Sequence, residues 1–291
     1  MDNDHFVKDG IGHSGEPVRQ FAELFSVRIK HDALEKFRVY GTIFVEDNEG
    51  NFCIFNRQQH LNQQQQDDDA DLINGTLPLT FKRPIRARSI FTLAFDLKDE
   101  DGNTIKDKFV AKLVTQKNGN FNKLGVDRMF GSMGCATIYY TFNQAANIYA
   151  IKDSIFMKHS FDSANSEGHS WVSGKIVFQY GRPFDSRSRS LATQDLEDDC
   201  LDIVLFNAAK PVPLVVDETG SCYKFPLLRS HLVVPHSNSL IFKFDLVYSD
   251  KGMVKCIQFD KIIPMLNRFW MNLSDKEGDD MLIKLLLEFQ V

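Results

Sequence analysis

Apolar and polar residues alternate with a period of two along much of the chain from Phe25 onward. The clearest runs are found at residues 25–29, 39–45, 91–97, 138–142, 172–178 and 240–246. Only an extended strand places every second side chain on one face, so each run predicts a β-strand. Short segments with Gly or Asn, such as 47–50 and 99–102, separate these runs and predict tight turns. The pattern predicts an all-β protein built from antiparallel sheets.

The C-terminal segment fits two periods. Apolar residues at 283, 285, 287, 289 and 291 would line one face of a strand, whereas those at 281, 282, 285, 286 and 289 would line a helix that starts after Asp279-Asp280. We favour a strand because the rest of the chain has the period of β-structure.

Short blocks of the first half recur in the same order in the second half. The matched pairs are Val39–Ile43 with Val172–Ile176, Ile54–Asn56 with Leu205–Asn207, Leu77–Leu79 with Phe225–Leu227, and Phe91–Leu97 with Leu240–Leu246. Colinear matches indicate an internal duplication. We therefore expect two similar antiparallel β-sandwich units, at 21–126 and 135–291, behind a flexible N-terminal tail at 1–20.

Two polar segments interrupt the strand pattern. Residues 58–71 are rich in Gln and Asp, and residues 186–202 are charged and account for a longer spacing between the matched blocks. Such compositions bury too little apolar surface to offset the entropy of ordering, so we expect exposed loops.

Gly41 and Gly174 occupy the same place in the matched strands. A glycine inside a strand indicates a bulge or the close approach of another group. Because phenylalanine is abundant, we expect an aromatic ring to rest on each glycine, and we expect Phe95 and Phe244 to be buried.

Composition agrees with an ordinary soluble protein. The 291 residues carry a formal net charge of −5, 43% are hydrophobic, and the count of 25 Phe favours stacked sheets. The acidic N-terminus is unlike a signal peptide, and no apolar run is long enough to span a bilayer. Five cysteines without close spacing predict reduced thiols. We therefore expect a cytoplasmic protein without a membrane partner.

Several of these blocks resemble a plant family of unknown function, the β-rich domain found in cereal stress proteins and in the C-terminal part of jasmonate-induced ribosome-inactivating proteins. The similar segments are Val39–Gly41, Asp47–Gly50, Ile54–Arg57, Leu77–Ala87, Trp171–Gly174, Val212–Val216 and Leu228–Val234. The resemblance covers about residues 21–262. It implies an association with stress and defence, and it carries over no catalytic residue.

Acidic residues and histidines were considered as metal or acid/base sites. Asp96, Asp99 and Asp101 lie near a Gly-containing turn, but the positions do not fit an EF-hand, and a solvated hairpin turn is favoured over a calcium site. Residues that could supply acid or base groups are His159, His169, His231 and His236, with Asp217 or Glu218. Their spacing matches no metal motif, so we expect no metal or cofactor.

Basic residues gather at Lys82, Arg83, Arg86 and Arg88, as a nucleic-acid surface would require. The acidic net charge and the adjacent Pro84 favour a charged sheet edge instead. Residues 125–134 are rich in Gly but lack the Lys of a phosphate-binding loop. A nucleic-acid partner is not expected.

The sequence thus favours a non-catalytic binding or interaction module in plant stress or defence. It does not identify the partner, which is a protein or a small molecule. One alternative is an enzyme that uses acid/base catalysis in a pocket between sheets or units. The residues that could line such a pocket are Tyr40, Trp171, Asp217 and His231. A lectin-like carbohydrate binder is another alternative.

Overall fold

The structure, a computed structural model, describes residues 20–33, 37–58, 75–87, 89–112, 124–143, 146–158, 170–181, 201–216, 222–235, 239–250, 253–263, 268–273 and 283–290. Within these ranges the regular elements are strands, which confirms the all-β prediction. Residues 1–19 of the predicted tail, and residues 59–71 and 186–200 of the predicted loops, lie outside the described ranges. At the end of the second predicted loop, Asp202 is buried against Lys175, so the expectation of exposure is wrong at that position.

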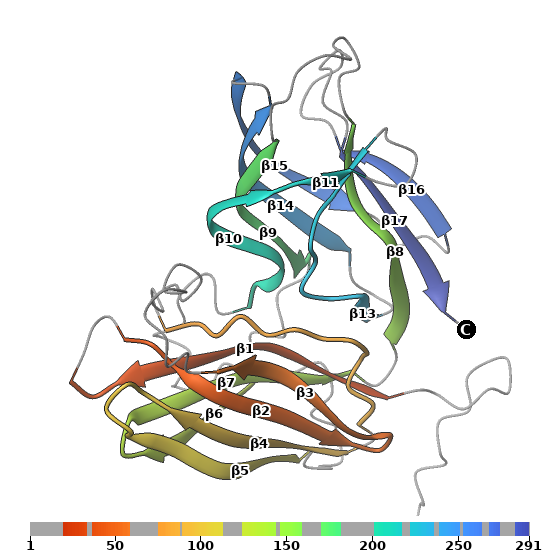
Figure 1. Ribbon diagram of the computed structural model, residues 1–291. Helices are drawn as coiled ribbons and strands as arrows, with labels where there is room; N and C mark the ends of the chain where they lie inside the picture. The colour runs from red at the N-terminus through yellow and green to blue at the C-terminus, as the bar shows by residue number, and fades with distance from the viewer. Residues whose placement is uncertain are drawn as a thin grey trace, which may run out of the picture.

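The strands form two lobes (Figure 1). In the first lobe, a three-stranded sheet has the order β1 (Phe21–His31), β7 (Gly134–Asn143), β6 (Leu124–Gly131). The second sheet of this lobe has the order β3 (Gly50–Arg57), β2 (Tyr40–Asp47), β4 (Ile90–Lys98), β5 (Thr104–Lys112). Apolar side chains of both sheets, including Val27, Ile138 and Leu93, pack into one core. The sheets therefore form a sandwich.

The second lobe is also built from two antiparallel sheets. One has the order β10 (Ile203–Pro213), β9 (Trp171–Tyr180), β14 (Leu240–Asp250), β15 (Met253–Ile263). The other has the order β11 (Val215–Val216), β12 (Cys222–Lys224), β8 (Ala146–Lys158), β17 (Ile283–Gln290), β16 (Arg268–Leu273), with β13 (His231–Pro235) also paired to β8. Strand β17 confirms the preference for a C-terminal strand.

The two lobes share a strand order. The order β3-β2-β4-β5 corresponds to β10-β9-β14-β15, and β1-β7-β6 corresponds to β8-β17-β16. Each matched sequence block lies in corresponding strands or, for Leu77–Leu79 and Phe225–Leu227, in the connection between them. Phe95 and Phe244 are both buried, as predicted. Residues 135–143, which the predicted division placed in the second unit, pair with β1 and β6 in the first lobe.

The prediction that aromatic rings rest on Gly41 and Gly174 is wrong. Both glycines have φ of +113°. A Cβ atom at Gly41 would lie 2.0 Å from the carbonyl oxygen of Asp96, and one at Gly174 would lie 2.1 Å from that of Asp245. The glycines are needed because the backbone takes a conformation that other residues avoid and because the neighbouring strand approaches closely.

Strand β1 lies between the lobes, and both of its faces are buried from Phe21 to Ile29. Its register against β7 shifts between Leu24 and Ser26, which leaves Phe25 at a bulge. Leu24 and Val27 therefore pack in the core of the first lobe, whereas Phe25 packs in the core of the second. The simple alternation predicted for 25–29 does not include this change of face.

Candidate functional site

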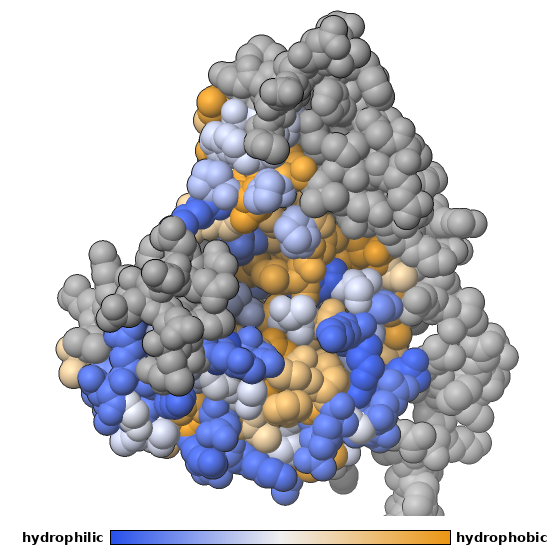
Figure 2. Space-filling model, in the orientation of Figure 1, coloured by the Kyte–Doolittle hydropathy of each residue, from blue (hydrophilic) through white to orange (hydrophobic). Residues whose placement is uncertain are grey.

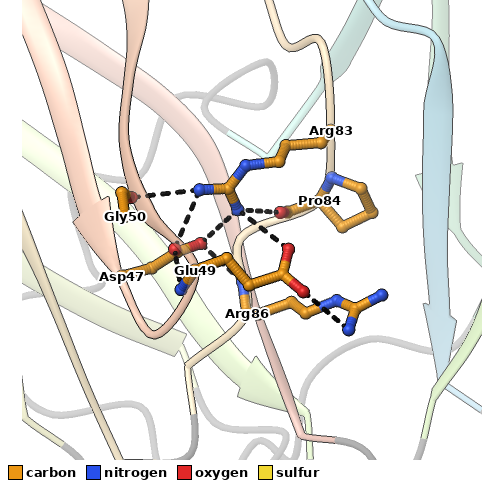
Figure 3. Close-up of polar contacts among 6 residues, drawn as sticks. All are labelled: Asp47, Glu49, Gly50, Arg83, Pro84 and Arg86. Atoms are coloured by element: carbon orange, nitrogen blue, oxygen red, sulfur yellow. Dashed lines mark hydrogen bonds and ion pairs between the residues drawn. The ribbon is translucent and has the colours of Figure 1, made fainter.

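The predicted basic cluster is part of an internal ion-pair network at the β2–β3 turn (Figure 3). The Arg83 guanidinium donates to both carboxylate oxygens of Asp47, over 2.6 and 2.9 Å, and to the carbonyl of Gly50. The backbone amide of Arg86 donates to Asp47, and its guanidinium lies 2.7 Å from Glu49. These contacts tie residues 83–86 to the β2–β3 turn.

The hydrogen bond to Asp47 raises the pKa of Arg83 above its ordinary value, so this side chain stays charged. Its guanidinium carbon also lies 4.2 Å from the centre of the Phe52 ring. Lys82 is exposed, and Arg88 lies outside the described residues. The carboxylates of Asp47 and Glu49 therefore bind Arg83 and Arg86, and these contacts fix the segment 83–86 in the fold.

The predicted acidic turn holds a buried His–Asp contact. Nε2 of His31 lies 3.0 Å from Oδ2 of Asp99, and the Asn103 side chain donates to the same oxygen. Burial acts to raise the pKa of Asp99, but the hydrogen bonds from Asn103 and His31 outweigh it and lower that pKa. The backbone amide of Ala33 donates to Nδ1 of His31, so both ring nitrogens are occupied. This pair fastens the end of β1 to the β4–β5 turn.

Asp96 and Asp101 are exposed, unlike Asp99, and Asp96 lies 3.4 Å from Lys106. Across the described ranges, no group of three or more His, Cys, Asp or Glu could hold a metal ion. Nor does any helix in those ranges have the length and hydropathy needed to cross a membrane.

Three of the residues proposed to line a pocket, Tyr40, Trp171 and His231, lie in different sheets. Tyr40 pairs with Lys98 in the first lobe, and its hydroxyl donates to Glu100. Trp171 pairs with Ser249 in β14, and His231 pairs with Ala150 in β8. Burial lowers the pKa of His231. The other predicted candidates, His159, His169, His236, Asp217 and Glu218, lie outside the described residues.

A buried polar contact that the sequence did not reveal joins the two lobes. The Arg229 guanidinium donates to Glu23 of β1 over 2.5 Å and to the carbonyl of Leu24 over 2.7 Å. Burial raises the pKa of Glu23, and Arg229 acts against that rise. The Arg229 guanidinium carbon lies 4.0 Å from the centre of the Phe81 ring. The position of Glu23 inside the apolar run Phe21–Phe25 is the sequence feature that could have indicated this contact.

Backbone hydrogen bonds accompany this ion pair. The amide of Phe81 donates to the carbonyl of Leu228 over 2.8 Å, and the amide of Ser230 donates back to Phe81 over 3.2 Å. The hydroxyl of Ser230 donates to the carbonyl of Lys82. The connection 75–87 of the first lobe is thereby bound to the segment before β13, and the lobes are held as one scaffold.

The outer face of the sheet β3-β2-β4-β5 carries exposed apolar side chains. Phe44, Ile90 and Val110 are each 42% exposed. Phe44 pairs with Ala94, and Val110 pairs with Thr92, which is two residues from Ile90 on β4. The three apolar residues therefore lie on one face of the sheet with Ala94 and Thr92 between them, and the contact between Lys108 and Glu46 crosses between Phe44 and Val110. We refer to Phe44, Ile90, Thr92, Ala94 and Val110 as the Phe44 face.

Charged residues border the Phe44 face. On β5, Lys106, Lys108 and Lys112 are exposed. Lys108 lies 3.8 Å from Glu46, a weak contact between exposed groups. Figure 2 shows a hydrophobic area with hydrophilic flanks on the front of the lower lobe, where Figure 1 places β2, β3 and β4. An apolar centre with a charged border is typical of protein interaction surfaces.

The sequence profile of the family described as Domain of unknown function (DUF6598) matches residues 21–268. No curated protein matches the sequence. Among solved structures, a two-domain fragment of Extended-Synaptotagmin 2 is similar, with 8% identity over 95% of this chain and 94% of that chain, at a TM-score of 0.23. That likeness is too low to support a conclusion about fold or function.

Proposed function

The chain belongs to the family described as Domain of unknown function (DUF6598), and we propose that it is a non-catalytic module that binds another protein through the Phe44 face. The observation that carries this proposal is the exposure of Phe44, Ile90 and Val110 on one face of a rigid sheet. Exposed apolar side chains that gather on one face favour contact with another protein.

The borders of the face favour a particular partner chemistry. Lys108 and Lys112 flank Val110 on the outer face of β5. Among the described residues, Glu46 contacts Lys108 and Asp96 contacts Lys106 of the same strand. A partner segment with apolar side chains and flanking acidic residues would match both features. Such a match increases the rate of association as well as the selectivity for the partner.

The interior contacts support a scaffold role. The buried carboxylates of Glu23, Asp99 and Asp202 are bound by Arg229, His31 and Lys175, respectively. Each contact joins different elements of the fold, so these carboxylates fix the positions of those elements relative to one another. An acid/base pair for catalysis would need a titratable group that is open to a substrate.

We also propose that the two lobes descend from one duplicated unit. The corresponding strand orders and the equal φ of Gly41 and Gly174 support this origin. A duplicated sandwich gives a large surface on one chain, which suits a binding module. The motif resemblance suggests a setting in plant stress or defence, and the acidic N-terminus and the cysteine spacing suggest the cytoplasm.

Affinity capture with wild-type and variant full-length protein tests the binding face. Phe44→Ser combined with Val110→Ser should abolish capture of a partner that the wild type retains. Phe130→Ser is the matched control, because Phe130 is 75% exposed on β6 of the other sheet. It should leave capture intact. A partner retained equally by all three proteins would overturn the proposal.

A panel of sugars and metabolites separates the alternatives. Binding of a carbohydrate that survives the Phe44→Ser and Val110→Ser changes would favour the lectin-like alternative. Turnover of a small molecule by the wild-type protein would favour the enzyme.

A further inference from the structure

Strand β15 forms an open edge of its sheet. It is the last strand in the order β10-β9-β14-β15, and it pairs with β14 along its whole length, from Met253 opposite Asp250 to Ile263 opposite Leu240. Within the described ranges no other strand pairs with it. One row of its backbone N–H and C=O groups is therefore available to another strand.

The side chains on the outer face of β15 do little to protect this edge. Val254 and Ile262 are 60% and 65% exposed, and Cys256, Gln258 and Asp260 between them are exposed as well. Among these five residues, Asp260 alone is charged. Natural edge strands are usually guarded by lysines, prolines or bulges.

The corresponding edge of the first lobe differs. Strand β5 takes the same place in the order β3-β2-β4-β5, and its outer face carries the exposed Lys106, Lys108 and Lys112. Lysines on an edge strand oppose pairing with another chain. The exposed outer faces of the two edge strands therefore differ: that of β5 is rich in lysine, and that of β15 is mostly uncharged.

We propose that β15 pairs in an antiparallel manner with β15 of a second copy of this chain, with Gln258 of each copy at the two-fold axis. In this register, Val254 of one copy lies opposite Ile262 of the other, and this pair occurs twice. On the other face, Ile257 lies opposite Phe259, also twice. The register also places Cys256 opposite Asp260. The apolar pairs on both faces favour it, and the two sheets then join into one.

The neighbouring registers lose this complementarity. A shift of two residues in one direction places Val254 opposite Asp260, and a shift in the other direction places Ile262 opposite Cys256. A shift by one residue would place outer-face side chains opposite inner-face positions, which the alternation of a strand forbids. The symmetric register is the one that matches apolar residues on both faces.

Sedimentation velocity of the full chain over a range of concentrations tests the proposal. The wild type should show a monomer–dimer equilibrium that shifts toward dimer as the protein concentration rises. Val254→Lys or Ile262→Lys should raise the dissociation constant by about tenfold or more, since each removes two apolar pairs of the symmetric interface. Phe130→Lys on the edge strand β6 is the matched control and should not change it, because Phe130 is exposed and lies outside both proposed surfaces.

A cross-link tests the register. In a Cys256→Ser background, Gln258→Cys should give a disulfide-linked dimer on mild oxidation, because this position faces itself across the axis, whereas Phe130→Cys should not. A wild-type chain that stays monomeric at every concentration would overturn the proposal. So would a dimer that persists in both lysine variants, or one that fails to cross-link through position 258.

Discussion

Arg229 of the second lobe binds Glu23 of the first, although 206 positions separate them in the chain. Side chains of both residues are about 5% exposed or less, and the Phe81 ring lies against the guanidinium. Two charges taken out of water are stable only when each satisfies the other. The relative position of the lobes therefore depends on this pair.

Replacing Arg229 with Met should destabilise the protein by about 3–5 kcal/mol, because Glu23 would remain buried without a counter-charge. Urea unfolding measures this loss. The double variant Glu23→Leu with Arg229→Met should recover much of the stability, since it removes both buried charges. A double variant as unstable as the sum of the two single changes would contradict this account.

Gly41→Ala and Gly174→Ala should each cost at least about 3 kcal/mol, because a positive φ and a backbone clash act together. Gly50 is the control: its φ is +107°, but a Cβ there would meet nothing within 4 Å. Gly50→Ala should cost only about 1 kcal/mol, from the backbone conformation alone. Thermal or urea melts of the three variants give the comparison. Equal costs at Gly41 and Gly50 would show that the clash with Asp96 is relieved by a small shift.

Asp47→Ala should reduce the unfolding free energy by about 2–3 kcal/mol, because a carboxylate that accepts charged and backbone hydrogen bonds is lost. Its side chain is 0% exposed. Glu49→Ala is the control, since its partner Arg86 is exposed and such pairs contribute about 0–1 kcal/mol. Urea melts at neutral pH measure both. A larger loss of unfolding free energy for Glu49→Ala than for Asp47→Ala would mean that the Glu49–Arg86 contact, and not Asp47, fixes the segment 83–86.

The free energy of unfolding should decrease on acidification, and protonation of His231 should account for part of that decrease. Burial lowers its pKa below the ordinary 6.5, so the unfolded chain binds a proton before the folded chain does. The stabilising contribution is complete above pH 6.5 and is lost as the pH falls through the lowered value. Urea melts from neutral to acid pH should show a smaller decline for His231→Gln than for the wild type. Parallel declines would show that His231 titrates alike in both states.

The local pattern determined the elements of this fold. Alternation is a property of neighbouring residues, so the strands at 39–45, 91–97 and 240–246 and the burial of Phe95 and Phe244 followed from it. The C-terminal strand also followed, because the period of two extended to residue 289. Turn chemistry at 47–50 was equally local, and β2 and β3 meet there.

The sequence alone could not specify which basic residue would meet Glu23, since the partner of a buried charge is set by folding in space. The bulge at Phe25 sends this ring into the second core, whereas a regular strand would have kept it with Val27. The conformations of Gly41 and Gly174 arise from the backbone of the adjacent strand, which no count of phenylalanines foretells. Alternation along one strand determined which residues are buried, but the docking of sheets and lobes decided which neighbours they meet, because contact between distant segments is made only when the chain folds.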